Sequence, residues 1–354
     1  MKIRSQDIFE HKTTGVVFRN RVGEKVMLEL HLLEPNKMEL HNVEDSTMQL
    51  AEDEVRIKLI YGGICGSDLS VFRGKIPYAS YPVRPGHELL GKVVAAGELA
   101  SDLLGARVVV LPNTFCGECE YCQRGQTNIC KNKRSMGVNI DGGFSEEVTV
   151  SSKYVIQIPD GVSDERAVLV EPLAVVVHAL KKVKIDNNTS IAIVGCGNEG
   201  MFAAALASSM GANVTAIDIN STKLERAKSL GVNRAVHPDD LDSETYDVVV
   251  EAAGAKQSVE KAVTLVRPGG TCILVGITQV ATLPMIQIVR SEITLSGSII
   301  YNFPTDFEEA INHLKKKTFK AEQIISKIVP FNEFQNAYAN AISGDFGKII
   351  LDFG

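Results

Sequence analysis

One stretch of the sequence constrains the fold more than any other, because an apolar segment at 190–194 runs directly into a glycine-rich turn. The turn reads Gly195, Cys196, Gly197, Asn198, Glu199 and Gly200, and a helix-like segment follows it. Glycines at this spacing permit a tight turn, close approach of the backbone to a pyrophosphate, and close packing of the helix on the strand. The helix then presents its N–H groups to the phosphates. This stretch therefore predicts a dinucleotide-binding site.

The chain from 190 to about 301 continues as an alternation of buried strands and helices. The predicted strands are 190–194, 213–218, 246–251, 271–275 and 293–299, and the predicted helices lie near 199–210, 222–230 and 257–266. Glycines at 211 and 231 and the turn at 267–270 end the three helices. This order is typical of an α/β, doubly wound, parallel sheet.

The residue that ends the second predicted strand indicates which dinucleotide is bound. Asp218 lies eighteen residues beyond Gly200, near the spacing of about 20 at which an acidic residue hydrogen-bonds the ribose 2′-hydroxyl. A carboxylate there repels a 2′-phosphate, so we expect NAD, with NADP less favoured. Lys223 could contact the same ribose, but a solvated lysine on a surface helix explains its position almost as well.

The chain on either side of this region has a different character. From about 26 to 155 it shows short alternating strands, such as 54–61, 107–111 and 147–150, which indicate a β-rich domain. The last fifty or so residues hold two amphipathic helices and a final strand at 348–353. Because a completed nucleotide-binding sheet has no room for that strand, we expect it to return to the first domain.

A cluster of cysteines lies inside the β-rich region. Cys116, Cys119, Cys122 and Cys130 follow the spacing C-x2-C-x2-C-x7-C. Four thiolates in one short lobe match a closed tetrahedral zinc site, which has no open position for chemistry. We therefore expect a structural zinc here.

Three further elements carry the ligand types of an open zinc site. Cys65 lies in the sequence GICGSD, His87 and Glu88 lie in PGHE, and Glu171 lies in VEPL. Each is weak evidence alone, because a single cysteine or histidine is more often a packed core residue. Together they predict a catalytic zinc, because all three precede a predicted dinucleotide-binding fold in the sequence.

The motifs GICGSD, PGHE, the cysteine cluster, DGGFSEE, VEPLAV, the glycine turn and RPGG occur in one order along the chain from about residue 26. With them the chain resembles the zinc-containing medium-chain alcohol dehydrogenases, in particular the polyol branch that includes sorbitol and L-idonate dehydrogenases. The resemblance implies a GroES-like catalytic domain, residues 1–174 and 302–354, with a structural zinc lobe at about 112–134. It also implies a Rossmann domain at 175–301 that binds NAD, and an active site between the two domains.

The resemblance also implies roles for individual residues. Cys65 and His87 match the family's zinc ligands, and either Glu88 or Glu171 supplies the third. Ser67 matches the hydroxyl that accepts the substrate proton. The segment that lies along the nicotinamide is Val275, Gly276 and Ile277. The expected activity is oxidation of a secondary alcohol on a polyol or sugar-like substrate by hydride transfer to NAD.

Three positions depart from the family pattern. Ser70 stands where many relatives carry a histidine that completes the proton relay, so the proton's exit route stays open. Glu199 stands where an apolar residue is usual, and an acid there weakens phosphate binding unless it points away. Ile300 precedes Tyr301 where sorbitol dehydrogenases carry an arginine. The segment 65–88 also resembles aminocyclitol (2-deoxy-scyllo-inosamine) dehydrogenases. Threonine or butanediol as the substrate, and a redox-inactive structural role, are the remaining alternatives. Residues near Phe72, Tyr78, Phe144 and Tyr301 are expected to line the substrate pocket but do not decide between these substrates.

Composition restricts the partners. The formal net charge of −6 gives no attraction to nucleic acid or to an anionic membrane. The first 24 residues lack the apolar core of a secretory signal, and seven cysteines suit a reducing compartment, so we expect a cytoplasmic protein with a small-molecule substrate. The resemblance implies a homodimer or homotetramer, because the relatives pair the edge strands of their Rossmann sheets, and the apolar strand at 293–299 would be that edge here.

Overall fold

The computed structural model describes residues 26–44, 49–241 and 243–354, so the first 25 residues of the expected catalytic domain lie outside it. The first half contains β1 (Val26–Glu34), β2 (Lys37–Glu44), β3 (Glu54–Ile64), α1 (Gly66–Phe72), β4 (Glu88–Ala96), β5 (Arg107–Val110), α2 (Glu120–Gln123), β6 (Glu147–Ser151), β7 (Val155–Gln157), α3 (Asp164–Ala167) and α4 (Val170–Leu180). The second half contains β8 (Ser190–Val194), α5 (Asn198–Ser209), β9 (Asn213–Ile217), α6 (Ser221–Ser229), β10 (Arg234–Val236), β11 (Tyr246–Glu251), α7 (Lys256–Thr264), β12 (Val266–Leu274), α8 (Met285–Arg290), β13 (Thr294–Gly297), α9 (Thr305–Leu314), β14 (Ile325–Pro330), α10 (Phe334–Ser343) and β15 (Lys348–Asp352). Within the described ranges no helix has the length and apolarity needed to cross a membrane.

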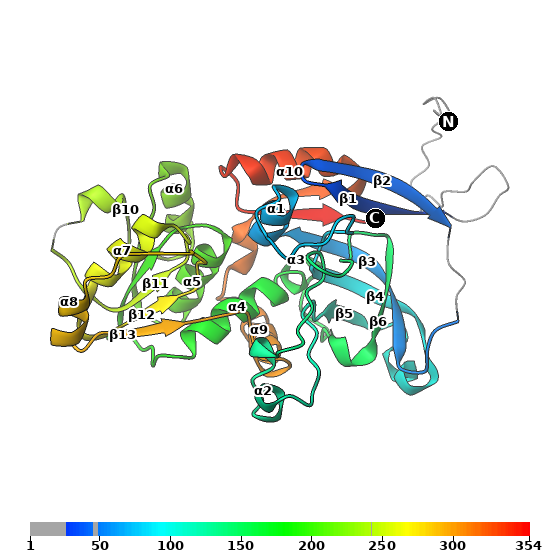
Figure 1. The fold of residues 1–354 in the computed structure, drawn as a ribbon, viewed down its shortest axis with the longest axis horizontal. Coiled ribbons are helices and arrows are strands. Elements are labelled where there is room, and N and C mark those ends of the chain that lie inside the picture. Colours follow the sequence, from blue (N-terminus) through cyan, green and yellow to red (C-terminus); the bar gives the residue numbers. More distant parts are fainter. Residues whose placement is uncertain (1–25, 45–48, 242) are drawn as a thin grey trace.

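A six-stranded parallel sheet forms one half of the molecule, with the order β10-β9-β8-β11-β12-β13 (Figure 1). Both faces of its central strand β8 are apolar: Ile191 and Ile193 pack in the core that holds α5, while Ala192 and Val194 pack in the core that holds α7. A strand buried on both faces must be apolar throughout, which explains the continuous run in its sequence. The predicted doubly wound sheet is confirmed.

The other half contains a second sheet, of seven strands, in which β14-β15-β3-β4-β5-β7 lie in that order and β6 pairs with β3. The final strand β15 lies between β14 and β3, antiparallel to β3, so its predicted return to the first domain is confirmed. Figure 1 shows the consequence: the red C-terminal strand lies among the blue and cyan strands of the first half. The proposed boundary at 174/175 falls inside α4, the helix that connects the two halves.

The structure differs from the prediction at four elements, and one of them is the six-residue helix α8, which was not predicted. Strand β10 has three residues, too few for a periodic pattern, and was not predicted. Strand β14 was also missed, because its burial does not follow a simple alternation. The turn at 267–270 was expected to precede a strand, but it forms a register shift within β12, which pairs with β11 on both sides of the turn.

The position of β15 generates a stability prediction. Leu351 is fully buried in this strand, so Leu351→Ala should lower the free energy of unfolding by about 2–5 kcal/mol. Ile328 on β14 is 41% exposed, and Ile328→Ala should cost less than about 1 kcal/mol. Urea titration of both variants checks this. Equal losses would contradict the placement of β15 inside the sheet.

Candidate active site

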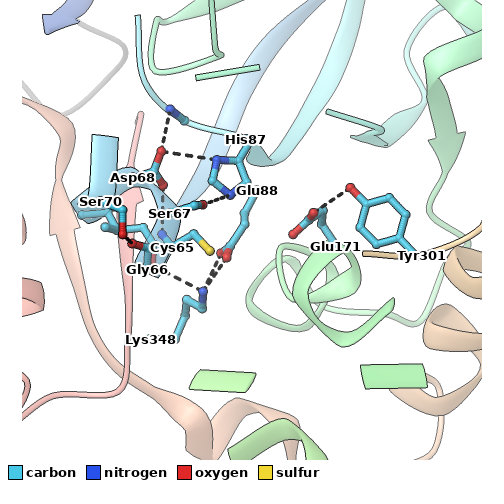
Figure 2. A network of polar contacts seen from close by, with 12 residues as sticks. Cys65, Gly66, Ser67, Asp68, Ser70, His87, Glu88, Glu171, Tyr301 and Lys348 are labelled. Carbon is cyan, nitrogen blue, oxygen red and sulfur yellow. Dashed lines mark hydrogen bonds and ion pairs between the residues drawn. The ribbon is translucent and has the colours of Figure 1, made fainter. Parts of the chain in front are cut away.

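Three of the predicted metal ligands lie together at the end of β3 and the start of β4. Cys65, His87 and Glu88 each offer a donor atom, and these atoms lie within 4.8 Å of one another (Figure 2). Strand pairing brings them together, because Gly63, near the end of β3, is the antiparallel partner of Glu88 in β4. A thiolate, an imidazole and a carboxylate at this separation are a donor set that fits zinc.

The buried carboxylate of Asp68 holds the Cys65 and His87 segments in place. Its Oδ2 accepts a hydrogen bond of 2.9 Å from the Cys65 N–H, and its Oδ1 accepts one of 3.3 Å from the Gly86 N–H. The same Oδ1 lies 3.3 Å from Nδ1 of His87. A carboxylate behind a histidine fixes the orientation of the ring in metal sites. Asp68 was part of a quoted motif, but no role had been assigned to it.

Asp68 also controls the charge of the histidine. Burial alone would lower the pKa of His87, but the Asp68 carboxylate raises it well above its ordinary value. On the other side of the ring, Ser67 Oγ lies 3.2 Å from Nε2 of His87. Because a metal must displace the proton of His87, metal binding at this site strengthens as the pH rises.

A fully buried lysine pairs with Glu88. Lys348, the first residue of β15, places its Nζ 2.6 Å and 2.8 Å from the two carboxylate oxygens, and neither side chain is exposed. Burial lowers the pKa of Lys348, but the charges of Glu88 and Cys65 more than offset this and leave it above its ordinary value. Lys348 was not predicted, because nothing local in the sequence connects it to a residue 260 positions away.

Glu171 reaches the site from α4 and is held by a separate chain of hydrogen bonds. The hydroxyl of the buried Tyr301 donates to Glu171 Oε1 at 2.7 Å, and the Asn113 amide donates to that hydroxyl at 2.9 Å. Ser135 Oγ donates in turn to Asn113 Oδ1 at 2.7 Å. Burial raises the pKa of Glu171 to about 7, and the charge of Glu88 adds to the rise. Burial and the Glu88 charge both disfavour the ionised form of Glu171, and a bound cation would favour that form.

The four cysteines of the predicted structural lobe also converge. All four sulfur atoms lie within 4.8 Å of one another, with distances of 4.0 Å from Cys116 to Cys122, 4.0 Å from Cys119 to Cys130 and 3.6 Å from Cys130 to Cys116. Zinc–sulfur bonds of about 2.3 Å in a tetrahedron place sulfurs about 3.8 Å apart. Backbone N–H groups lower the pKa of Cys119 to about 6, which favours the thiolate. The geometry fits a closed zinc site.

The three glycines of the nucleotide turn have distinct surroundings. Gly195 has φ +96°, a value that favours glycine, and an added Cβ would meet Ala253 Cβ at 2.6 Å. A Cβ on Gly200 would meet the Gly195 carbonyl oxygen at 1.8 Å, so the helix packs too closely for any other residue. Gly197, at the N-terminus of α5, faces open space. Such a turn leaves room for a pyrophosphate beside the N-terminus of α5 and Asn198.

Asp218 lies beside this turn at the end of β9. Its Oδ2 accepts from the Cys196 N–H at 2.6 Å and its Oδ1 from the Asn220 N–H at 2.8 Å. The carboxylate is thereby fixed against the loop, with acceptor capacity left on both oxygens. Lys223 lies in the first turn of α6, where its N–H donates to the Asn220 side chain at 3.2 Å.

A cavity of about 510 Å³ joins the metal donors to the nucleotide domain. Besides Cys65, Ser67, His87 and Glu171, its walls include Glu199, Val275 and Ile277. Gly276, between the last two, packs against the backbone of Gly254. Glu199 thus points into the cavity beside the metal donors, and its Oε2 is buried without a hydrogen-bond partner. Burial raises the pKa of Glu199 to about 8.

Of the aromatic residues near which the pocket lining was expected, one lines the cavity itself. Tyr78 lines the cavity, but Phe144 and Tyr301 are fully buried and Phe72 packs against Tyr338. The sequence pattern could not distinguish these positions, because core and cavity walls use the same apolar residue types. Ser70 Oγ donates to the Gly66 carbonyl at 3.0 Å on α1 and is not among the cavity walls.

Comparison with known proteins agrees with this geometry. Residues 51–160 match the family described as alcohol dehydrogenase GroES-like domain, and residues 200–316 match the family described as zinc-binding dehydrogenase. The chain is 31% identical over 317 residues to a sorbitol dehydrogenase of Halalkalibacterium halodurans, covering 84% of this chain and 91% of that protein. It is 32% identical over 300 residues to 2-dehydro-3-deoxy-L-galactonate 5-dehydrogenase of Pseudoalteromonas atlantica, covering 81% and 87%.

Solved structures show the same relationship. Galactitol-1-phosphate dehydrogenase from Escherichia coli superposes with a TM-score of 0.85 at 29% identity, covering 92% of this chain and 99% of that one. The chain therefore belongs to the zinc-binding medium-chain alcohol dehydrogenases, in the branch that includes polyol dehydrogenases, and is a zinc-dependent, NAD(P)-dependent alcohol or polyol dehydrogenase.

Proposed function

We propose that the protein oxidises a secondary hydroxyl of a polyol or sugar-like substrate and transfers the hydride to NAD. One observation carries this proposal: a single cavity is lined both by the donors Cys65 and His87 and by Val275 and Ile277 of the nucleotide domain. A hydroxyl at the metal end therefore lies in the same space as the segment expected along the nicotinamide. The polar residues of the wall suit a substrate with several hydroxyl groups: Asn113, Ser135, Asn139 and Ser298.

We propose Cys65, His87 and Glu88 as the protein ligands of the catalytic zinc, because these three form the compact donor group. Glu171, held by Tyr301 on the opposite side, is the alternative third ligand. Zinc bound there supplies a Lewis acid that lowers the pKa of the substrate hydroxyl. Ser67 lines the cavity next to His87, where its hydroxyl can accept the released proton. The second zinc, in the four-cysteine lobe, is structural.

The nucleotide-binding residues support NAD as the oxidant. The glycine turn and the N-terminus of α5 leave space for the pyrophosphate, and Asp218 holds a carboxylate beside that space. A 2′-phosphate would be repelled by this carboxylate. Glu199 is directed toward the cavity, and a raised pKa keeps it protonated at neutral pH, so it does not oppose the phosphates.

We also propose that the protein assembles through the nucleotide domain and functions in the cytoplasm. Strand β13 is the edge of its sheet, and α8 beside it exposes Met285, Ile286 and Val289 at 60%, 75% and 70%. An exposed apolar patch next to an open sheet edge favours pairing with a second copy. The seven cysteines are all unpaired, which supports a reducing compartment.

The two metal sites can be separated by mutation. Elemental analysis should find about two zinc ions per wild-type chain and about one in Cys65→Ser and in Cys119→Ser. Cys65→Ser should also lose about a thousandfold in kcat with polyol and NAD, since the Lewis acid is worth several kcal/mol. Retention of two zinc ions or of normal turnover in Cys65→Ser would refute the ligand assignment.

Asp218 can be tested by cofactor preference. Asp218→Ala should weaken NAD binding about tenfold or more, because a hydrogen bond to a charged group is worth about 1.5–3 kcal/mol. NADP binding should weaken less or improve, since repulsion of the 2′-phosphate is removed. Fluorescence titration with both reduced cofactors measures the ratio. An equal loss of affinity for both cofactors would indicate that Asp218 only stabilises the glycine turn and does not select the cofactor.

Assembly can be tested by light scattering. The chain mass is 38.4 kDa, so the wild type should give twice or four times that value at micromolar concentration. Ile286→Lys should shift the mass toward a single chain, because it places a charge in the apolar patch. The matched control is Leu99→Lys, which changes an apolar residue 72% exposed outside this patch. A wild type of single-chain mass would contradict the proposal.

A further inference from the structure

The cavity contains one positive side chain that the oxidation itself does not use. Among the described residues that line the cavity, Lys133 is the sole lysine or arginine. It lies near the end of the four-cysteine lobe, three residues after Cys130. Cys65 lies between β3 and α1, and His87 and Glu88 lie at the start of β4, so Lys133 comes from a separate segment of the cavity wall.

Lys133 lacks an acidic partner in the described part of the chain. Its half-buried ammonium donates one hydrogen bond of 3.0 Å, to the backbone carbonyl of Asn128, and no ion pair within 4.0 Å involves it. Burial lowers the pKa of Lys133, and the charge of Cys130 in the four-cysteine lobe offsets part of this effect. A partly buried cation without a carboxylate partner is unfavourable, and a bound anion would relieve that cost.

The position of Lys133 is fixed by its surroundings. Asn128, whose carbonyl holds the ammonium, is buried, and its side-chain amide donates to the Ile299 carbonyl at 3.2 Å. Ile299 belongs to the nucleotide half of the molecule and also lines the cavity. Lys133 is therefore anchored where the lobe meets the nucleotide domain, at the wall of the substrate space.

The neighbouring lysine provides a contrast. Lys131 is 59% exposed and pairs with Glu120, Nζ to Oε1 at 2.7 Å. It lies outside the cavity wall. The two lysines thus differ in whether they have an acidic partner. Lys131 pairs with a glutamate on the surface, whereas Lys133 lies at the cavity wall without a carboxylate partner.

We propose that Lys133 binds an anionic group, a carboxylate or a phosphate monoester, on the polyol whose hydroxyl is oxidised at the metal end. This inference rests on the proposed polyol dehydrogenase activity and narrows its substrate to sugar acids or polyol phosphates. Lysine binds both kinds of anion as a point charge. Both kinds also occur in the names of the relatives reported above.

The test compares matched neutral and anionic substrates in the zinc-loaded protein with NAD. The pairs are galactitol with galactitol 1-phosphate, and galactitol with L-galactonate. The wild type should have a kcat/KM at least about tenfold higher for the phosphate or the carboxylate than for galactitol. The pair that shows the larger preference identifies the anion.

The variants separate charge recognition from general damage. Lys133→Met should lower kcat/KM for the preferred anionic substrate about 10–100-fold. Its kcat/KM for galactitol should change by less than about threefold. Lys133→Arg should retain most of the preference, and the control Lys131→Met should change neither substrate. Equal losses for neutral and anionic substrates in Lys133→Met, or no wild-type preference for either anion, would overturn the inference.

A binding measurement distinguishes failure of the Lys133 inference from failure of the proposed polyol dehydrogenase reaction. Calorimetry with the NADH-bound protein should show that Lys133→Met weakens binding of galactitol 1-phosphate or L-galactonate about tenfold or more. If Lys133→Met weakens anion binding but the wild type oxidises no polyol, the anion site is supported and the polyol reaction is refuted. Turnover of neutral polyols with equal anion binding in both proteins would support the reaction and refute the anion site.

Discussion

The active site depends on one fully buried ion pair, between Glu88 and Lys348. A buried pair is tolerated only when its geometry is close to ideal, because both charges have lost their water. Here two short contacts satisfy both carboxylate oxygens. The lysine is the first residue of β15 and the glutamate the first of β4, next to His87, so Glu88 has its partner only when the last strand has joined the sheet. The position of the C-terminal strand and that of this donor are therefore coupled.

The other metal donors also have buried partners that hold them in position. Asp68 fixes His87 and the backbone of Cys65, and Tyr301 fixes Glu171. Each outer residue comes from a different part of the chain, and each is buried. Such second partners hold ligands in position and adjust their charge. Buried partners thus orient the donors from the protein interior, which leaves the cavity side of the donors free for substrate.

Local patterns were sufficient to predict the glycine turn, the parallel sheet, the four-cysteine lobe and the return of the last strand. These features depend on spacing within a few residues or on the number of strands that a sheet can hold. Lys348 and the link from Asn113 through Tyr301 to Glu171 could not be predicted, because they depend on pairing between residues far apart in sequence. Phe144 was expected near the substrate for a related reason: an aromatic residue in a core and one in a cavity wall cannot be distinguished until the packing is known.

The hydrogen-bond chain that ends on Glu171 begins at Ser135, five residues after the last cysteine of the lobe. Zinc-bound thiolates are targets for peroxide and other electrophiles, and their modification releases the metal. Loss of the lobe's shape would then withdraw Ser135 from Asn113 and leave Tyr301 with one fewer partner. Oxidation of the four cysteines would in this way change the surroundings of Glu171, the alternative third ligand, without modifying any residue of the compact donor group.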